Sequence, residues 1–170
     1  MNIIAIDPGN TESAYVVWDG INLHKFNKVA NYKIYDIMAC FLGDYVMVME
    51  QVACMGMPVG EDVFETVFWS GKFCHEWDCK GMEYYRIKRS VIKMHLCQSM
   101  RAKDSNIVTA LVDRFDPERK FGKYGKGTKK NPEFFYGFSK DIWQAFALAV
   151  TWYDQNQSES VPKRNTKGEK

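Results

Sequence analysis

The chain has 170 residues, enough for one domain with a two- or three-layer core, and its 46% apolar and 15% aromatic residues exclude a disordered protein. No apolar run approaches the roughly 20 residues of a membrane helix, and the N-terminus lacks the basic and apolar regions of a secretory signal. The five cysteines are scattered and odd in number, which suits reduced thiols. We therefore expect a cytoplasmic protein without membrane contact.

The net charge of +2 hides an uneven distribution. Residues 1–78 carry 4 Lys/Arg and 11 Asp/Glu, whereas residues 79–170 carry 19 and 10, which gives net charges of −7 and +9. An acidic region that could hold divalent metal beside a basic region that could hold polyphosphate is typical of nucleases. The alternative is that folding mixes the two halves and leaves no charged patch.

The first part of the chain predicts an antiparallel meander. Apolar and alternating stretches predict strands over residues 3–6, 13–18 and 21–29, and Asp19-Gly20 is a strong hairpin signal between the last two. Apolar residues at helical spacing then predict a helix over residues 32–41.

A central strand and a second helix follow. The short apolar run 45–49 predicts a strand buried on both faces, which ends at Glu50. A helix is expected from residues 60–62 to about Trp77, and Gly71 within it predicts close packing against another backbone. One face of this helix carries Val63, Phe64, Val67, Phe68, Gly71 and Cys74.

The second half is basic and contains one long loop. We expect a strand over 83–87, a helix over 104–115 with Asp104 as N-cap, a loop over 116–138, and a last helix over 139–153 with Ser139 as N-cap. Lysines interleaved with aromatic residues in the loop suggest contact with a nucleic-acid backbone, although a solvated lysine loop is the alternative. The basic residues proposed to contact DNA are Arg86, Lys88, Arg89, Arg101, Lys103, Lys120, Lys123, Lys126, Lys129 and Lys130.

The acidic residue after the first strand has several interpretations. Asp7 precedes a Pro8-Gly9 turn, so it could be a metal ligand held by a rigid sheet or a residue that only stabilises a turn. Sugar-kinase and actin-like ATPases also begin with an apolar strand, an Asp and a Gly-containing turn. The chain is too short for those two-lobed proteins and has no phosphate-loop or dinucleotide glycine motif, so we expect no nucleotide cofactor.

Three carboxylates lie at element termini. Asp7 ends the first strand, Glu50 ends the fourth, and Asp141 is in the first turn of the last helix. In a meander followed by alternating helices and strands, the first and fourth strands are neighbours in the ribonuclease H-like arrangement. Three converging carboxylates would repel each other unless cations lay between them, which predicts bound Mg²⁺ or Mn²⁺.

The motifs Ile-Ala-Ile-Asp7-Pro-Gly-Asn, Val-Met-Glu50-Gln and Asp141-Ile-Trp-Gln-Ala-Phe-Ala-Leu-Ala-Val-Thr carry a resemblance to a known family. In order and spacing they resemble RuvC-type Holliday junction resolvases, closest to the short versions encoded by bacteriophages. The resemblance spans nearly all of residues 2–153.

This resemblance implies an α/β ribonuclease H-like fold with a mixed five-stranded sheet flanked by helices. It also implies a homodimer, metal ligation by Asp7, Glu50 and Asp141, and paired nicking of a four-way DNA junction by two-metal hydrolysis. Mg²⁺ would be the cofactor, with two ions per site and Mn²⁺ as a substitute. If the chain is phage-encoded, it would act in the cytoplasm of the host cell.

The chain departs from the family pattern at one position. Members usually carry a second acidic residue three positions after the first one on the last helix, and here that residue is Gln144. A glutamine carbonyl is a neutral, weaker ligand. Either Gln144 coordinates, or Asp104 or Asp62 completes the site, and we expect Gln144→Asp to keep or raise metal-dependent cleavage.

Two further roles remain open. Lys93 resembles the family's lysine near the scissile phosphate, with Lys103 as the second choice, and either could instead only position a phosphate. Phe64 and Phe68 are candidates for wedges at the junction centre, or for core or dimer contacts.

The sequence thus predicts a nuclease domain over residues 1–155, a basic, disordered tail over 156–170, and resolution of four-way junctions. The alternatives are a broader nuclease for forks, flaps and replication intermediates, and a junction-binding protein with a weakened catalytic site.

Overall fold

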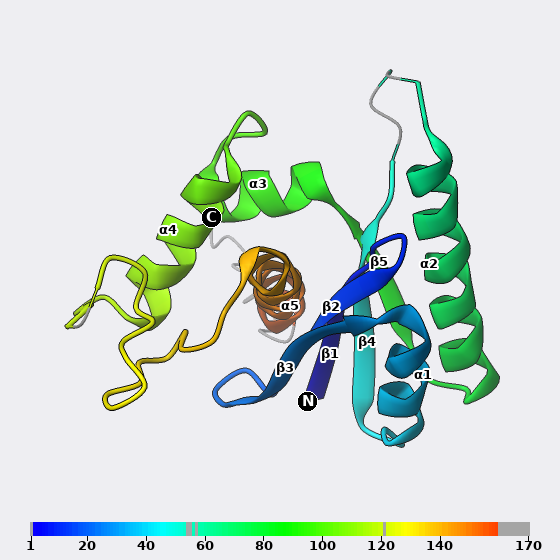
Figure 1. Ribbon diagram of the computed structural model, residues 1–170, viewed down its shortest axis with the longest axis horizontal. Coiled ribbons are helices and arrows are strands. Elements are labelled where there is room, and N and C mark those ends of the chain that lie inside the picture. Colours follow the sequence, from blue (N-terminus) through cyan, green and yellow to red (C-terminus); the bar gives the residue numbers. More distant parts are fainter. Residues whose placement is uncertain (1, 54–55, 57, 121, 160–170) are drawn as a thin grey trace, which may run out of the picture.

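The computed structural model describes residues 2–53, 56, 58–120 and 122–159, and these form one sheet and five helices (Figure 1). The sheet contains β1 (Asn2–Asp7), β2 (Glu12–Trp18), β3 (Leu23–Ala30), β4 (Tyr45–Gln51) and β5 (Tyr84–Lys88). The helices are α1 (Asn31–Ala39), α2 (Glu61–Cys79), α3 (Arg89–Cys97), α4 (Asp104–Phe115) and α5 (Lys140–Glu159).

The sheet is mixed, with the strand order β3-β2-β1-β4-β5. The first three strands pair antiparallel, whereas β4 pairs parallel with both β1 and β5. The predicted neighbourhood of the first and fourth strands is therefore confirmed. Since β1 and β4 run in the same direction, their carboxyl ends meet at the same edge of the sheet.

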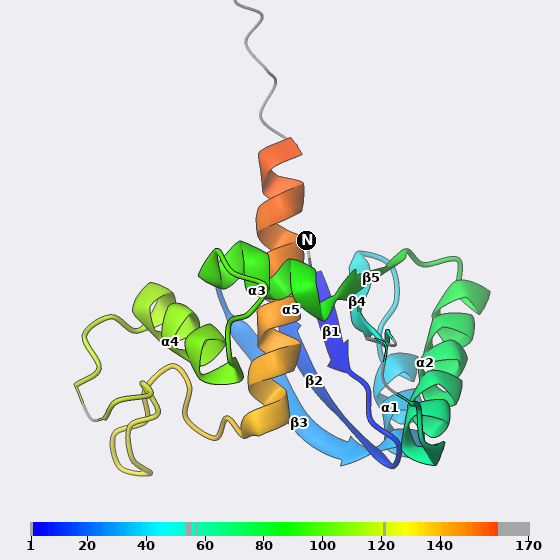
Figure 2. The ribbon, with the colours of Figure 1, turned by 90° about the horizontal axis from the view of Figure 1, so that it is seen from above.

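Helices cover both faces of the sheet (Figure 2). The aliphatic and aromatic residues of one sheet face pack with α3, α4 and α5, and those of the other face pack with α1 and α2. Helix α5 crosses β1, β2 and β4, and its Ala145, Ala147 and Ala149 are fully buried. Small side chains let the helix backbone approach the sheet closely.

The long segment between α4 and α5 folds onto the core. Phe135 and Phe138 are buried, and Phe134 and Phe135 pack around Phe146 of α5 with ring centroids 5.8 and 5.9 Å away. Lys126 Nζ donates a hydrogen bond to the carbonyl of Phe138 at 2.5 Å. The predicted loop has no regular helix or strand in its described part, but its aromatic residues fix it to α5.

Several local predictions were wrong. Helix α3 lies in a basic stretch to which we assigned no element, and α4 is preceded by Lys103 as N-cap, so Asp104 is its first helical residue. Helix α5 runs to Glu159, so residues 156–159 are helical and not part of a disordered tail. The rest of that tail, residues 160–170, lies outside the described residues.

The apolar face predicted for α2 is buried only at its C-terminal end within the described chain. The helix buries Phe73, Cys74 and Trp77, whereas Phe64 and Phe68 are 63% and 57% exposed. A Cβ added to Gly71 would meet nothing within 4 Å, so the expected contact with another backbone does not occur within the described chain. Helical spacing shows that residues share a face, but not what covers that face.

Within the described residues, no helix has both the length and the apolar character that a membrane crossing requires.

Replacement of a core aromatic on α5 tests this packing. Phe146 is fully buried and contacts Trp18 edge-on at 5.4 Å, so Phe146→Ala should lower the free energy of unfolding by about 3–5 kcal/mol. Tyr136→Ala, at an exposed position in the preceding loop, should cost only about 0.5 kcal/mol. Urea denaturation measures both, and equal losses would contradict the central place of α5.

Candidate metal and nucleic-acid site

One row of residues across the sheet carries two of the three predicted carboxylates. Asp7 lies opposite Ala14, and Ala14 lies opposite Lys28. On the other side Ile6 pairs with Met49, so Asp7, the last residue of β1, lies beside Glu50, the next-to-last residue of β4. By strand alternation this row faces the α5 side, where Ala14 is part of the core.

The turn after Asp7 is fixed by a buried polar network. Ser13 Oγ donates to Asn31 Oδ1 at 2.6 Å, Asn31 Nδ2 donates to the carbonyl of Gly9 at 2.9 Å, and the Gly9 amide donates to Ser13 Oγ at 3.2 Å. A Cβ on Gly9 would lie 2.3 Å from the carbonyl oxygen of Glu12. The position therefore requires glycine, and the direction in which Asp7 leaves the sheet is set by this turn.

The start of α5 brings the third carboxylate to the same row. The Asp141 carboxylate forms an ion pair with Lys28 Nζ at 2.8 Å, and Lys28 Nζ lies 3.7 Å from Glu12 Oε2. Gln144, one turn further, is buried, and no hydrogen-bond donor of the described residues reaches its Oε1. A buried acceptor without a donor is a feature of a site that binds a cation.

On the opposite side of Asp7, an arginine joins two acidic residues. Arg89 is the first residue of α3 and donates to Glu50 Oε2 at 3.1 Å and to Asp104 Oδ1 at 2.7 Å. Burial raises the pKa of Glu50, and Lys93, half-buried one turn further along α3, is near enough that its charge opposes this rise. The sequence-predicted Lys93 and Asp104 thus lie beside Glu50, and Asp104 is joined to it through Arg89.

The electrostatics of the row show that Asp7 is affected by the other two carboxylates. The pKa of Asp7 is raised from 3.8 to about 7, first by burial and then by the negative charges of Glu50 and Asp141, whereas Arg89 and Lys28 oppose the shift. Burial also raises the pKa of Glu50, and its partner Arg89 opposes this change. A cluster of this kind stabilises bound cations.

The carboxylates are not arranged as a complete metal site. Among the described residues, no three His, Cys, Asp or Glu side chains lie close enough together to hold a metal ion. Glu50 is paired with Arg89 and Asp141 with Lys28, so two of the three predicted ligands point toward cationic side chains. Asp62, the remaining acidic candidate, accepts a hydrogen bond from Asn10 in the turn after Asp7 at 2.7 Å.

Hollows flank the site on two sides. One, of about 330 Å³, lies between α2 and the ends of β4 and β5 and is lined by Glu50, Gly71 and Arg86. The other, of about 350 Å³, lies between α4 and α5 and is lined by Asp104, Ser105, Val108, Tyr124, Lys126, Lys140, Trp143 and Gln144. The first hollow lies on the α2 side of the sheet, and the second lies on the α5 side, which the carboxylate row faces.

The predicted DNA-contacting residues surround the site unevenly. Arg86 and Lys126 line the two hollows, Arg89 is engaged by carboxylates, and Lys120 pairs with Glu118 at 2.8 Å. The others are exposed: Lys88, Arg101, Lys103, Lys123, Lys129 and Lys130.

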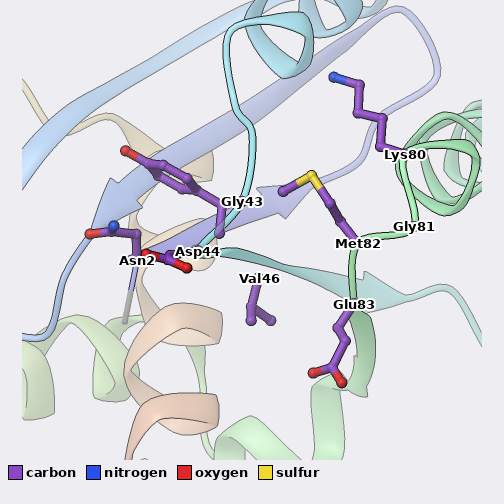
Figure 3. A pocket seen from close by; sticks show the side chains of 9 residues that line it. Asn2, Gly43, Asp44, Val46, Lys80, Gly81, Met82 and Glu83 are labelled. Carbon is purple, nitrogen blue, oxygen red and sulfur yellow. The ribbon is translucent and has the colours of Figure 1, made fainter.

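A further hollow of about 560 Å³ lies at the opposite edge of the sheet (Figure 3). It is lined by the starts of β1 and β4, with Asp44, Lys80 and Glu83 around it. Lys80 Nζ donates to the carbonyl of Met38 at 2.7 Å. None of the predicted site residues lines this hollow, so it does not belong to the candidate site.

Sequence reasoning missed three residues of the site. Lys28 and Glu12 belong to neighbouring strands, and Lys140 precedes Asp141 and lines the hollow beside Gln144. The pairing of Lys28 with Asp141 depends on strand register and helix position, which no local motif reveals. For Lys140, the available signal was its position next to a predicted metal ligand.

The strand order, the helices on both faces and the carboxylates at the ends of β1 and β4 define an α/β fold of the ribonuclease H-like type. Among solved structures, the chain is similar to Thermus thermophilus RuvC, with a TM-score of 0.66 and 14% identity over 94% of this chain and 97% of that one. It is also similar to T. thermophilus RuvC in complex with a Holliday junction substrate, with a TM-score of 0.69 and 12% identity over 94% and 96% of the two chains.

At these identities the similarity shows a RuvC-like fold. No protein-family model matches the sequence, and no curated protein matches it.

The raised pKa of Asp7 predicts a pH-dependent stability in metal-free protein. Between pH 3.8 and about 7 the folded state retains a proton that the unfolded state releases, so this contribution to stability is present below pH 3.8 and is lost by about pH 7. Asp7→Asn removes the titration. Urea denaturation in EDTA should show the variant gaining stability relative to wild type from pH 4 to pH 8, and a constant difference would contradict the raised pKa.

Proposed function

We propose that this protein is a divalent-metal-dependent endonuclease that resolves four-way DNA junctions by paired nicks. The observation that carries the proposal is the placement of Asp7, Glu50 and Asp141 around one end of β1 and β4 in a RuvC-like fold. In one of the similar structures, T. thermophilus RuvC is in complex with a Holliday junction substrate, which supports branched DNA as the substrate here.

The chemistry of the residues present fits a Mg²⁺ or Mn²⁺ ion, although their spacing among the described residues does not complete a site. Asp7, Glu50 and Asp141 supply the hard oxygen ligands that these ions prefer, and the buried Oε1 of Gln144 adds a neutral oxygen. A divalent cation would offset the burial and repulsion that raise the pKa of Asp7. Such an ion, when bound, activates a water molecule and stabilises the leaving oxygen of a phosphodiester.

Other residues of the chain would bind and orient the DNA. Lys93 is our choice for the cation that stabilises charge developing at the scissile phosphate, because it lies near Glu50. Lys126 and Lys140 line the hollow beside Gln144 and would bind the phosphates of the strand that enters the site, whereas Arg86 would contact DNA on the α2 side of the sheet. The exposed lysines at 123, 129 and 130 would extend this contact along the duplex.

A homodimer is proposed through the exposed part of α2. Phe64, Val67 and Phe68 form an apolar stripe on this helix, and Gly71 next to it has open space above its Cα. A stripe of this kind marks a contact surface. In a dimer formed there, the backbone of the second copy would lie close to Gly71, as the sequence predicted. The active sites of the two copies would make the two nicks.

The cleavage assay compares a four-way junction, a fork and a linear duplex in Mg²⁺. Wild-type protein should make symmetric paired nicks in the junction and leave the linear duplex intact. Asp7→Asn should lower cleavage by at least about 100-fold because it removes a metal ligand, with junction binding retained. Asp36→Asn, at an exposed position on α1, is the matched control and should cut normally.

Other results of this assay point to other functions. Nicks on forks and flaps as well as junctions would favour the broader branched-DNA nuclease. Binding without cleavage in either Mg²⁺ or Mn²⁺ would favour a junction-binding protein with a weakened site, for which Gln144 is the structural argument. An Asp7→Asn variant as active as wild type would contradict the metal site itself.

The dimer surface has a separate test. Phe64→Ser/Phe68→Ser should shift the mass in solution from dimer to monomer, measured by analytical ultracentrifugation. Ile21→Ser, at an exposed apolar residue in the β2–β3 turn, should not change it. A variant that remains dimeric but no longer distorts or cuts a junction would support the alternative role of these phenylalanines as wedges.

A further inference from the structure

The ion pair between Lys28 and Asp141 lies inside the candidate site. Lys28 Nζ is 2.8 Å from Asp141 Oδ2, with side chains 39% and 35% exposed. The pair joins a lysine ammonium and a carboxylate, so opposite charges meet at the start of α5.

Backbone register places Lys28 there. Lys28 lies two strands from Asp7 in the same row, about 10 Å away by strand spacing, and the small Ala14 lies between them. Phe26, two residues earlier on the same face, packs against Phe138 with ring centroids 4.8 Å apart. This contact fixes β3 against the segment that enters α5, so the backbones that carry Lys28 and Asp141 are held near each other.

The carboxylates of the row are unevenly spaced. At the α5 end a single predicted ligand, Asp141, lies beside the Lys28 ammonium, which is also 3.7 Å from Glu12, and Gln144 adds no charge. At the other end two predicted ligands, Asp7 and Glu50, lie next to each other, with Arg89 shared between Glu50 and Asp104. Repulsion between adjacent carboxylates is therefore greatest between Asp7 and Glu50, where one divalent cation would relieve it.

We propose that Lys28 is the fixed cation of this site: its ammonium replaces a second divalent ion at Asp141, so each chain binds one metal ion, next to Asp7 and Glu50. The inference rests on the proposed function and revises the two ions expected from the sequence. A lysine ammonium has three donors, so with one on Asp141 it retains donors for an oxygen of the scissile phosphate. Lys28 is thus a positioning residue for Asp141 and a phosphate contact.

The number of bound ions is the direct test. Purified full-length protein is titrated with Mn²⁺, without DNA, and free Mn²⁺ is measured by electron paramagnetic resonance. Wild type and Gln144→Asp should each bind one ion per chain, because Lys28 still neutralises the α5 end. Lys28→Met/Gln144→Asp should bind two, because it exposes two carboxylates with no cation between them.

Lys25 offers a matched control. It lies on the same strand as Lys28, three residues earlier, and strand alternation places it on the opposite face. Lys25→Met/Gln144→Asp should bind one ion. Circular dichroism spectra of all variants confirm that the ion count is compared between folded proteins.

Cleavage supplies a second readout. Lys28→Met should lower junction cleavage in saturating Mg²⁺ by about 100-fold, the effect of removing one fixed donor at a developing charge. Lys28→Arg keeps the cation, so its junction cleavage should stay within about tenfold of wild type. If Lys28 had a purely structural role that did not need its charge, the Arg and Met variants would not differ in this way.

The outcomes separate this inference from the proposed function. Wild type that cuts junctions and binds two Mn²⁺ ions would overturn the inference and leave the nuclease intact. A Gln144→Asp protein with two ions would show that residue 144 alone sets the count, and would also overturn it. Wild type that binds no Mn²⁺ and cuts nothing would overturn the proposed function and the inference together.

Discussion

The parallel pairing of β1 with β4 is the constraint on which the rest of the site depends. It sets Asp7 and Glu50 side by side at the end of two buried strands, where like charges are costly. The surrounding residues relieve that cost. Arg89 from α3 and Lys28 from β3 approach from opposite sides, and each is held by a second acidic residue, Asp104 or Glu12. The result is a row in which two adjacent carboxylates, Asp7 and Glu50, have a cationic side chain on either side.

Helix α5 adds the third predicted carboxylate above this row. Its buried alanines bring the helix close to the sheet, and its first turn then places Asp141 and Gln144 above the row. The same helix anchors the lysine-containing segment before it through Phe134, Phe135 and Phe138. Helix α5 therefore carries part of the candidate site and also packs against the aromatic residues of the basic loop, so a change in its position would affect both.

The sequence was sufficient for the sheet, the position of α5 and the acidic residues, because each rests on a local pattern. Apolar runs that end in Asp7 or Glu50 identify strand ends directly. Helix α3 was missed because Ile92 is its one fully buried residue, so its apolar residues show no clear period. On α2 the period was visible, but Phe64 and Phe68 face outward, since a period does not tell what covers the face. The counterion Lys28 was not recognised, because its partner Asp141 is 113 residues away in the sequence. The two meet only because strand register places Lys28 in the same row as Asp7.

Register also makes the β2–β3 hairpin unusually intolerant of length changes. A Cβ on Gly20, at φ +100°, would lie 2.5 Å from the ring of Tyr153 on α5, and a bulge already lies between Val17 and Trp18. Because side chains alternate with a period of two, one residue inserted between Leu23 and Lys28 would turn the lysine to the opposite face unless a second bulge absorbed it. A one-residue insertion in β3 would therefore separate Lys28 from Asp141 and leave that carboxylate without its cationic neighbour.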